Sequence, residues 1–382
     1  MTMYAQQLEE KAARLSALLA PFAAPEMEVF PSPPEGYRLR AEFRLWHDEA
    51  GVDYVMVAPG ERASPETVRK IRTLPIASAA INALMPRLRE ALNGDEILRR
   101  KIFQCEFLST LQGDMLVTLV YHRRLDEAWQ RRAAALAAEL GVALIGRSRG
   151  QKIVLEREFV EETLTVAGRD WHYRQYEGAF TQPNGRMCEA MLAWACAQAG
   201  DDTRDLLELY AGNGNFTLPL SQHFRKVLAT EISKSGIRAL RENVAMNGVD
   251  NIRLARLSAE EFSAAWRGER EFQRLKQDGI TLADYDFSTI FVDPPRAGID
   301  AATLAMMQRF ARIIYISCNP ATLADNLKTL TQTHRISACA LFDQFPGTEH
   351  IESGVVLQRK NRLFSHEDSG CCARNYYHAF KT

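Results

Sequence analysis

Hydrophobic and polar positions follow two different periods near the N-terminus. Leu8, Ala12 and Leu15 recur at helical spacing, which predicts a first helix over about residues 4–20. Residues 37–46 (YRLRAEFRLW) instead alternate strictly between apolar and polar side chains. This alternation predicts a strand with one buried face and with three arginines on its open face. Such a basic face is typical both of a solvated surface and of a nucleic-acid contact, and the sequence leaves both interpretations open.

The segment that follows mixes the two periods. Residues 50–175 predict one α+β domain, because helical and strand-like stretches alternate there without a repeat. The expected helices lie near 76–93 and 126–140, and the expected strands lie near 101–111, 115–122, 142–147 and 151–156. Together with the first helix, these elements predict an N-terminal domain over residues 1–178, and its basic clusters make it the expected RNA-binding part.

A different pattern begins near residue 180. Pro183 can occupy the first turn of a helix that is capped by Thr181 or Gln182. From there strands alternate with helices, and the expected strands lie near 204–210, 226–231, 252–256, 287–292, 312–317, 336–342 and 353–358. Such alternation predicts an α/β domain over residues 179–358 with a Rossmann-like, doubly wound sheet. Its ligand site is expected at the carboxyl ends of the strands.

Composition narrows the class of protein. The chain has 382 residues, of which 46% are hydrophobic and 25% charged, which are values typical of globular domains. No run is long and apolar enough for a membrane span, and the N-terminus is unlike a secretory signal, so a cytoplasmic protein is expected. The seven cysteines lie at irregular spacings, which favours neither a disulfide framework nor a metal or iron–sulfur site. Residues 359–382 show no periodicity and are expected to form a disordered tail.

The distribution of charge along the chain is more informative about nucleic-acid binding than the net charge is. The net charge is -1, yet residues 85–155 carry twelve lysines and arginines against eight acidic residues. Clusters of this kind are most often a solvated face, and they also suit a surface that contacts phosphates.

The stretch DLLELYAGNGNF (205–216) is a hydrophobic strand that runs into a glycine-rich turn. Gly212 and Gly214 permit positive φ and a close approach of the backbone to a ligand. Thr217 stands where a dinucleotide fingerprint needs a third small residue, so nicotinamide and flavin cofactors are disfavoured. Glu231 ends the next strand and can accept hydrogen bonds from both hydroxyls of a ribose. These features together favour S-adenosylmethionine.

Two further strand ends supply candidate chemistry. Asp293 is followed by two prolines that stiffen the loop, and Cys318 follows the next strand along the chain. A lone cysteine is most often simply buried. A thiol beside a methyl donor can, however, act as a nucleophilic catalyst. Addition of the thiolate to C6 of uracil makes C5 nucleophilic enough to attack the methyl group. A general base must then remove the C5 proton. Glu349 and Glu352, just before the last strand, are the two candidate bases.

Five motifs resemble, in order, those of the RNA uracil-5-methyltransferase family. They are FTQPN (180–184), ELYAGNGNF (208–216), DPPRAG (293–298), ISCNP (316–320) and HIESGV (350–355). The stretches YRLRAEFRLWHD, FQCEFLSTL, LVYHRRLDEAW and LFDQFP are similar to the bacterial tRNA (uracil-5-)-methyltransferases, which make ribothymidine in the T-loop. The resemblance covers about residues 5–358. The iron–sulfur cysteine cluster and the extra N-terminal barrel of many ribosomal relatives do not appear in this sequence.

The resemblance implies methylation of C5 of the T-loop uridine (position 54) of tRNA. It implies that Cys318 is the nucleophile and that Glu352 takes the C5 proton. The implied contacts of S-adenosyl-L-methionine are Gln182, Tyr210, Asn215, Glu231 and Asp293. The implied RNA contacts are Arg44, Phe103, His122 and Arg296; Phe103 is of a type that stacks on an unpaired base, whereas His122 suits an ordinary surface position equally well.

Partners and alternatives complete these expectations. The expected partner is the T-arm of tRNA, with transfer-messenger RNA as a second target, and we expect a monomer without metal or membrane contact. One alternative is methylation of uracil in 23S rRNA. Another is a non-catalytic RNA-binding protein with a vestigial cofactor pocket, which is disfavoured because Cys318, Glu352, Asp293 and Glu231 are all present.

Overall fold

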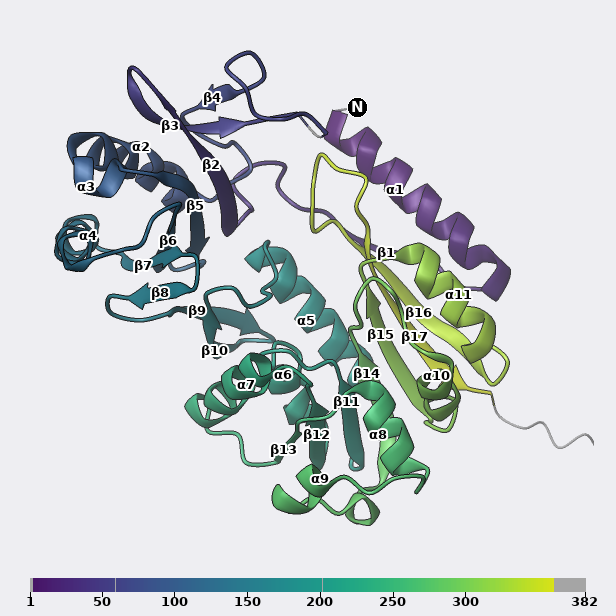
Figure 1. The fold of residues 1–382 in the computed structure, drawn as a ribbon. Coiled ribbons are helices and arrows are strands. Elements are labelled where there is room, and N and C mark those ends of the chain that lie inside the picture. The colour runs from purple at the N-terminus through teal and green to yellow at the C-terminus, as the bar shows by residue number, and fades with distance from the viewer. Residues whose placement is uncertain (1–2, 59, 201, 361–382) are drawn as a thin grey trace, which may run out of the picture.

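Two large sheets carry most of the secondary structure, and a hairpin lies between them (Figure 1). The computed structural model describes residues 3–58, 60–200 and 202–360. The expected tail falls largely on residues 361–382, which lie outside the described residues. No helix in the described part of the chain is both long and apolar enough to cross a membrane.

The first sheet has seven strands in the order β4-β3-β2-β5-β6-β7-β8. Its strands are β2 (Arg40–Asp48), β3 (Gly51–Met56), β4 (Arg69–Ile71), β5 (Ile102–Ser109), β6 (Met115–Tyr121), β7 (Ala143–Ser148) and β8 (Gln151–Val154). Neighbours are antiparallel except β6 and β7. Helices α2 (Ala79–Gly94), α3 (Glu96–Arg99) and α4 (Glu127–Leu140) accompany this sheet, and Leu88, Trp129 and Leu136 pack into one core with Phe43 and Phe107. The strict alternation along 37–46 therefore arises because one face of β2 meets this core, as predicted.

A two-stranded hairpin connects the two sheets in sequence. Strands β9 (Phe159–Val166) and β10 (Arg169–Tyr176) pair antiparallel. The hairpin packs against α5 (Gly185–Ala199) and α7 (Lys234–Met246). The hydrophobic pattern did not locate this hairpin or strands β3 and β4. In β9 the buried side consists of Val160, Glu162, Leu164 and Val166, so a buried glutamate interrupts the apolar alternation.

The second sheet has eight strands in the order β1-β16-β17-β15-β14-β11-β12-β13. Its strands are β1 (Glu28–Phe30), β11 (Asp205–Leu209), β12 (Lys226–Thr230), β13 (Ile252–Ala255), β14 (Phe287–Val292), β15 (Arg312–Ser317), β16 (His334–Phe342) and β17 (Glu352–Arg359). Only β17 among these described strands is antiparallel to its neighbours, so the sheet is otherwise parallel.

Alternate residues of these strands enter two different cores. On β15, Ile313 and Tyr315 face one core, whereas Ile314 and Ile316 face the other. Helices cover both faces, as a doubly wound sheet requires. The associated helices are α1 (Met3–Leu19), α5, α6 (Thr217–Leu220), α7, α8 (Ala259–Trp266), α9 (Gln273–Gln277), α10 (Ala301–Met307) and α11 (Pro320–Leu330), with the short 3-10 turns η1 (Ala20–Phe22), η2 (Ser221–His223) and η3 (Leu282–Asp284). The predicted doubly wound α/β fold is confirmed.

Two expectations need comment. The predicted cap of α5 was wrong: Asn184 caps this helix by accepting a hydrogen bond from the Met187 amide at 3.1 Å, and Pro183 precedes the cap.

The predicted domain boundary at residue 178 stays a prediction. The N-terminal segment nevertheless reaches across that boundary, because β1 pairs with β16 and α1 packs against α11.

Gly354 on β17 provides a test of packing in the second sheet. A Cβ atom at this position would lie 2.7 Å from the Trp194 ring of α5. The indole cannot easily retreat, because its Nε1 donates to Glu28 at 2.9 Å. We expect Gly354→Ala to lower the free energy of unfolding by about 1–3 kcal/mol, as overpacking of a core does.

The matched control is Gly94→Ala, since nothing lies within 4 Å of that Cβ position. Urea denaturation should show no loss of stability for this variant, because alanine favours the helix. Equal midpoints for Gly354→Ala and the wild type would contradict the packing account.

Candidate active site

A cavity of about 570 Å³ opens at the carboxyl ends of β11, β12, β14 and β15. Its lining includes residues that the sequence singled out separately. These are Gln182, Tyr210, Gly212, Asn215, Glu231, Asp293, Arg296, Cys318 and Glu352. The structure thus brings together every residue predicted to contact the cofactor and both residues predicted to be catalytic.

The glycine-rich turn after β11 shapes one wall of the cavity. Tyr210, Gly212 and Gly214 have φ angles of 62°, 58° and 89°. A Cβ at Gly214 would lie 2.3 Å from Leu240, so glycine is required there for the turn to approach α7. Positive φ at the non-glycine Tyr210 marks a conformation held by its surroundings, as is common at binding sites.

Glu231 is fixed against this turn. Its Oε2 accepts a hydrogen bond from the Gly212 amide at 2.9 Å, and its Oε1 accepts one from the Ser233 amide at 2.6 Å. Each carboxylate oxygen has a second lone pair. Glu231 can therefore still accept hydrogen bonds from the two hydroxyls of a ribose.

The wall of the cavity contains two buried acidic residues that sequence reasoning missed, Glu162 and Glu208. Glu208 is buried, and its Oε2 has no hydrogen-bond partner. Burial raises the pKa of Glu208 to about 8. An unsatisfied polar atom on a cavity wall calls for a polar ligand group. Together with Gln182, Tyr210 and Asn215, it fits an adenosine that carries an amino-acid chain, as S-adenosyl-L-methionine does. Its place in the motif ELYAGNGNF was the signal that could have identified it.

The loop after β14 and the turn that carries Cys318 are tied together. The Asn319 amide group donates to the Arg296 carbonyl at 3.0 Å, and the Thr322 hydroxyl donates to the same carbonyl at 3.3 Å. Ser317 Oγ donates to the Asn319 carbonyl at 3.1 Å. These bonds fix the backbone on both sides of Cys318, which is only partly buried.

Strand pairing brings Glu352 beside Cys318. Ser317 and Ser353 are partners in the β15–β17 ladder, so the residues that adjoin them meet at the strand ends. Glu352 is 4% exposed and lines the cavity. Glu349, the other candidate base, is exposed and lies outside the cavity lining. The geometry therefore favours Glu352.

Burial sets the protonation of this group of residues. Burial, and then the Glu352 and Asp293 carboxylates, raise the pKa of the Cys318 thiol to about 11, while Arg296 lowers it. Burial also raises the pKa of Asp293 to about 7, and burial followed by Asp293 raises the pKa of Glu352 well above its usual range. At neutral pH the thiol is protonated, and a carboxyl group can hold a proton beside it.

The residues predicted to contact RNA fall in two places. Arg296 lines the cavity, whereas Phe103 and His122 line a separate hollow on the first sheet together with Arg123 and Arg149. The Phe103 and His122 rings stack with centroids 3.8 Å apart. Neither sequence spacing nor periodicity predicted this stack, because Phe103 lies on β5 whereas His122 lies just after the end of β6.

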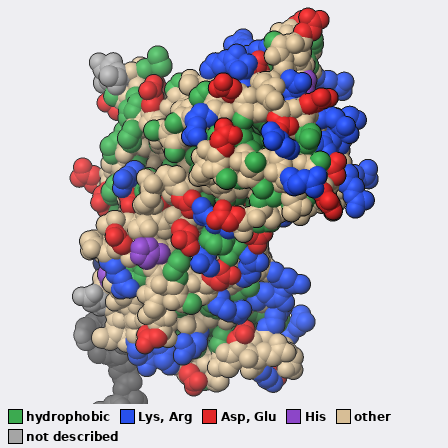
Figure 2. Space-filling view, turned by 90° about the vertical axis from the view of Figure 1, so that its left-hand side faces the viewer, with side chains coloured by type: hydrophobic (Ala, Val, Ile, Leu, Met, Phe, Trp, Pro, Cys, Tyr) green, Lys and Arg blue, Asp and Glu red, His purple; other side chains and the backbone are tan. Residues whose placement is uncertain are grey.

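The basic clusters predicted from the sequence are partly engaged in ion pairs. Arg132 pairs with Asp95 at 2.5 Å, and Arg147 pairs with Glu177 at 2.6 Å. Arg44 is exposed on β2. Lys and Arg side chains are numerous on the face shown in Figure 2, with Asp and Glu among them. The surface is therefore mixed in charge rather than uniformly basic.

Three aromatic side chains that were not predicted as site residues line the cavity, namely Tyr176, Phe180 and Phe216, and among them only Phe180 is exposed. Phe180 lines the cavity and is 75% exposed. It belongs to the FTQPN motif, which was the available signal. Within the described residues, no group of three or more His, Cys, Asp or Glu side chains is placed to hold a metal ion.

Comparisons with known proteins agree with this geometry. A family model described as tRNA (Uracil-5-)-methyltransferase matches residues 3–360. The tRNA/tmRNA (uracil-C(5))-methyltransferase of Ectopseudomonas mendocina is 58% identical over 94% of this chain and 97% of its own length. The enzyme of the same description from Neisseria gonorrhoeae is 55% identical over 94% and 99%.

A solved structure shares the fold. It is the tRNA (uracil-54, C5)-methyltransferase of Pyrococcus abyssi in complex with S-adenosyl-L-homocysteine. The TM-score is 0.68 at 23% sequence identity, and the match covers 93% of this chain and 83% of that one.

The raised pKa of Cys318 can be tested by alkylation. Below pH 11 the rate of reaction with iodoacetamide follows the small thiolate fraction. Asp293→Asn removes a negative charge that raises the pKa of Cys318, so alkylation at pH 8 should be faster than in the wild type. Asp325→Asn, on the exposed side of α11, should leave the rate unchanged. Mass spectrometry of the Cys318 peptide gives the rate, and a slower reaction of Asp293→Asn would refute the electrostatic account.

Proposed function

This chain belongs to the tRNA (uracil-5-)-methyltransferase family, and from that premise we propose that it methylates C5 of the T-loop uridine of tRNA to form ribothymidine. S-adenosyl-L-methionine is the proposed methyl donor. The relatives from Ectopseudomonas mendocina and Neisseria gonorrhoeae are named for both tRNA and tmRNA, so the proposal includes tmRNA as a second substrate. The alternative target, 23S rRNA, has no such support from these two relatives.

The observation that carries the proposal is the meeting of Cys318 and Glu352 at one cavity. Methylation of C5 needs a nucleophile that attacks C6 and a base that reaches C5 on the same ring. The ladder between β15 and β17 places both groups at one sheet edge. A vestigial binding pocket would have no need for this pair.

In the proposed reaction Cys318 first loses its proton to solvent, and its sulfur bonds to C6 of the uracil. The electron pair of the C5–C6 double bond moves into an enolate. C5 then bonds to the methyl carbon as the bond from that carbon to the donor sulfur breaks, and the electron pair of the broken bond stays on the sulfur. When bound, S-adenosyl-L-methionine supplies this carbon as a sulfonium electrophile. Glu352 must be ionised to act as the base, and the positive charge of a sulfonium donor in the cavity favours that ionised form. Glu352 next takes the C5 proton, the C5–C6 double bond forms again, and the C6–sulfur bond breaks to release the thiolate. The raised pKa of Glu352 suits it to hold that proton.

The target base must leave its stacked position to enter the cavity. We propose that the first sheet holds the RNA while the second sheet carries out the chemistry, which corresponds to the division into residues 1–178 and 179–358. The stacked rings of Phe103 and His122 offer a flat surface for an unpaired base. Arg44 would contact phosphate from the exposed face of β2. A monomeric state stays a prediction.

The test of the proposal is a covalent complex through Cys318. With 5-fluorouridine in the T-loop, C5 carries no removable proton, so the wild type should form a stable protein–RNA complex that peptide mapping assigns to Cys318. Cys318→Ala should form none and should show no turnover with tRNA that lacks ribothymidine. It should still bind cofactor, because the thiol attacks the base.

Cys196→Ala serves as the matched control, since Cys196 is buried on α5 away from the cavity lining. It should methylate tRNA as the wild type does. Near-normal turnover by Cys318→Ala would overturn the covalent mechanism.

Binding of tRNA at several salt concentrations tests the RNA contacts. Phosphate contacts act through counterion release, so Arg44→Ala should weaken binding and reduce the salt slope by about one. Phe103→Ala should cost about 1–3 kcal/mol, the usual range for a lost base stack, with the slope unchanged.

Arg335→Ala controls for the loss of charge, because Arg335 is exposed on β16 in the other sheet. It should bind as the wild type does. If Arg44→Ala gave the same titration curves as the wild type, the first sheet would have no part in holding phosphates.

A further inference from the structure

The segment that leads into Glu352 has no regular structure of its own. Residues 343–351 join β16 to β17 without forming a helix or a strand, and Glu352 is the first residue of β17. Backbone carbonyls in such a segment need partners from elsewhere when they approach the protein interior. Glu352 is therefore held on one side by its ladder partner Phe342 and on the other side by whatever holds this loop.

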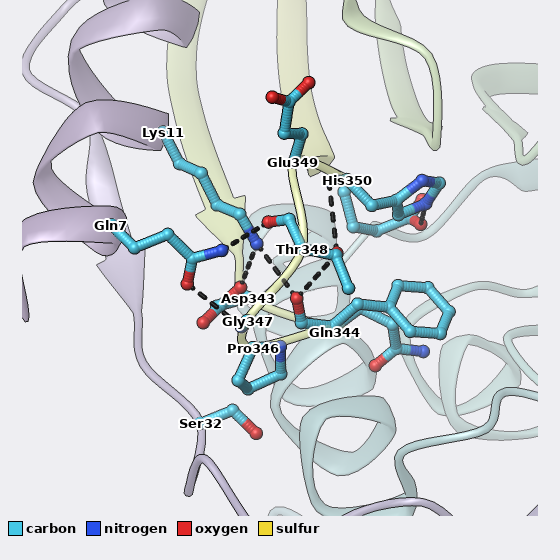
Figure 3. Close-up of polar contacts among 12 residues, drawn as sticks. Gln7, Lys11, Ser32, Asp343, Gln344, Pro346, Gly347, Thr348, Glu349 and His350 are labelled. Atoms are coloured by element: carbon cyan, nitrogen blue, oxygen red, sulfur yellow. Dashed lines mark hydrogen bonds and ion pairs between the residues drawn. The ribbon is translucent and has the colours of Figure 1, made fainter. Parts of the chain in front are cut away.

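One face of α1 supplies the partners. Gln7, Lys11 and Arg14 are spaced by four and three residues, so they lie along the same side of the helix. Gln7 Nε2 donates to the Thr348 carbonyl, and Gln7 Oε1 accepts from the Gly347 amide at 3.0 Å. The Arg14 guanidinium donates to the Glu349 carbonyl. Figure 3 shows the Gln7 and Lys11 side chains reaching from α1 to the loop.

Lys11 is the buried member of this face. It is 3% exposed, and its Nζ donates to Asp343 Oδ1 at 2.7 Å and to the Phe345 carbonyl at 3.0 Å. Asp343 is fully buried. A buried ion pair is costly to desolvate, and an apolar pair of similar size is often at least as stable. This pair therefore contributes a defined geometry more than it contributes stability.

The other side of the loop reaches the cofactor side of the cavity. Gln344 Nε2 donates to Gln182 Oε1 at 2.5 Å, and Gln182 lines the cavity. Asn184 Nδ2 donates to Ser32 Oγ at 2.7 Å and to the Gln344 carbonyl at 3.4 Å. The loop is thus held between α1 and the residues that precede α5.

We propose that Lys11 is a positioning residue for the proton-removal step, acting through the loop that α1 holds. The inference rests on the function proposed above. Cys318 lies after β15 and Glu231 lies after β12, and α1 bonds to neither segment through Gln7, Lys11 or Arg14. Loss of the Lys11 contacts should therefore displace the base more than the nucleophile. The loop meets the cofactor side through the Gln344–Gln182 bond, to which Lys11 does not contribute, so cofactor affinity should change little. Addition and methyl transfer should continue, and release of the methylated RNA should slow.

The test separates these steps in single-turnover experiments with tRNA that lacks ribothymidine. In Lys11→Met, methyl transfer from S-adenosyl-L-methionine should proceed at the wild-type rate. Breakdown of the methylated covalent complex should be slower by about 10–100-fold, the effect of a displacement near 1 Å in a catalytic group. The complex should accumulate and be visible in a denaturing gel. Lys11→Arg keeps the positive charge and the hydrogen-bond donors, so it should release the product faster than Lys11→Met does. Glu352→Gln lacks the base and serves as the reference in which release stops completely.

Two variants on α1 that leave the buried ion pair intact cover the case in which Lys11→Met does not fold. Gln7→Ala removes two loop contacts and leaves no buried charge, so it should slow release in the same direction but less than Lys11→Met. Gln6→Ala is the matched control, because Gln6 is exposed and donates to Glu10 on α1 itself at 3.0 Å. It should release product at the wild-type rate.

Two results would overturn the inference. The first is that both Lys11→Met and Gln7→Ala release the product at the wild-type rate. The second is that the rates of methyl transfer and of release fall by the same factor, which would show that Lys11 has a merely structural role. Failure of the proposed function would look different, because the wild type would then form no covalent complex with 5-fluorouridine RNA.

Discussion

The insertion of β17 between β15 and β16 is the constraint on which the active site depends. An antiparallel strand in a parallel sheet begins where its neighbours end, so its first residue lies at their carboxyl ends. The register pairs Ser353 with Ser317 and Glu352 with Phe342. A slip of one residue would turn every side chain of β17 to the opposite face and would separate the carboxylate from the thiol.

Burial gives this site its chemical character. Cys318, Asp293 and Glu352 all have raised pKa values, and desolvation is the largest cause for each. The charged forms are therefore disfavoured until a substrate or cofactor changes their surroundings. A thiol that stays protonated in the free protein is protected from reaction with small electrophiles, and a buried carboxyl group readily keeps a proton that it has taken up.

The N-terminal helix connects two parts of the chain that the sequence separates widely. Residues 3–30 precede the first sheet, yet α1 and β1 pack on the second sheet. The polar side of α1 binds the loop before Glu352, while Leu15 and Leu19 enter the hydrophobic core. The helix therefore contributes both to the stability of the second sheet and to the placement of one catalytic group.

The sequence alone predicted the seven strands of the second sheet from β11 to β17, because their apolar runs alternate with helical segments. It missed β1, which is only three residues long. It also determined which loops would meet, since the carboxyl ends of parallel strands share one edge. The position of the two residues left Glu349 and Glu352 as alternatives, because both stand near the same strand. The family resemblance already implied Glu352, and the register of β17 gives the physical reason for that choice. The stack of Phe103 on His122 and the Lys11–Asp343 pair had no signal in the sequence by itself. Each depends on contacts between segments far apart in the chain, and only tertiary packing decides which such segments touch.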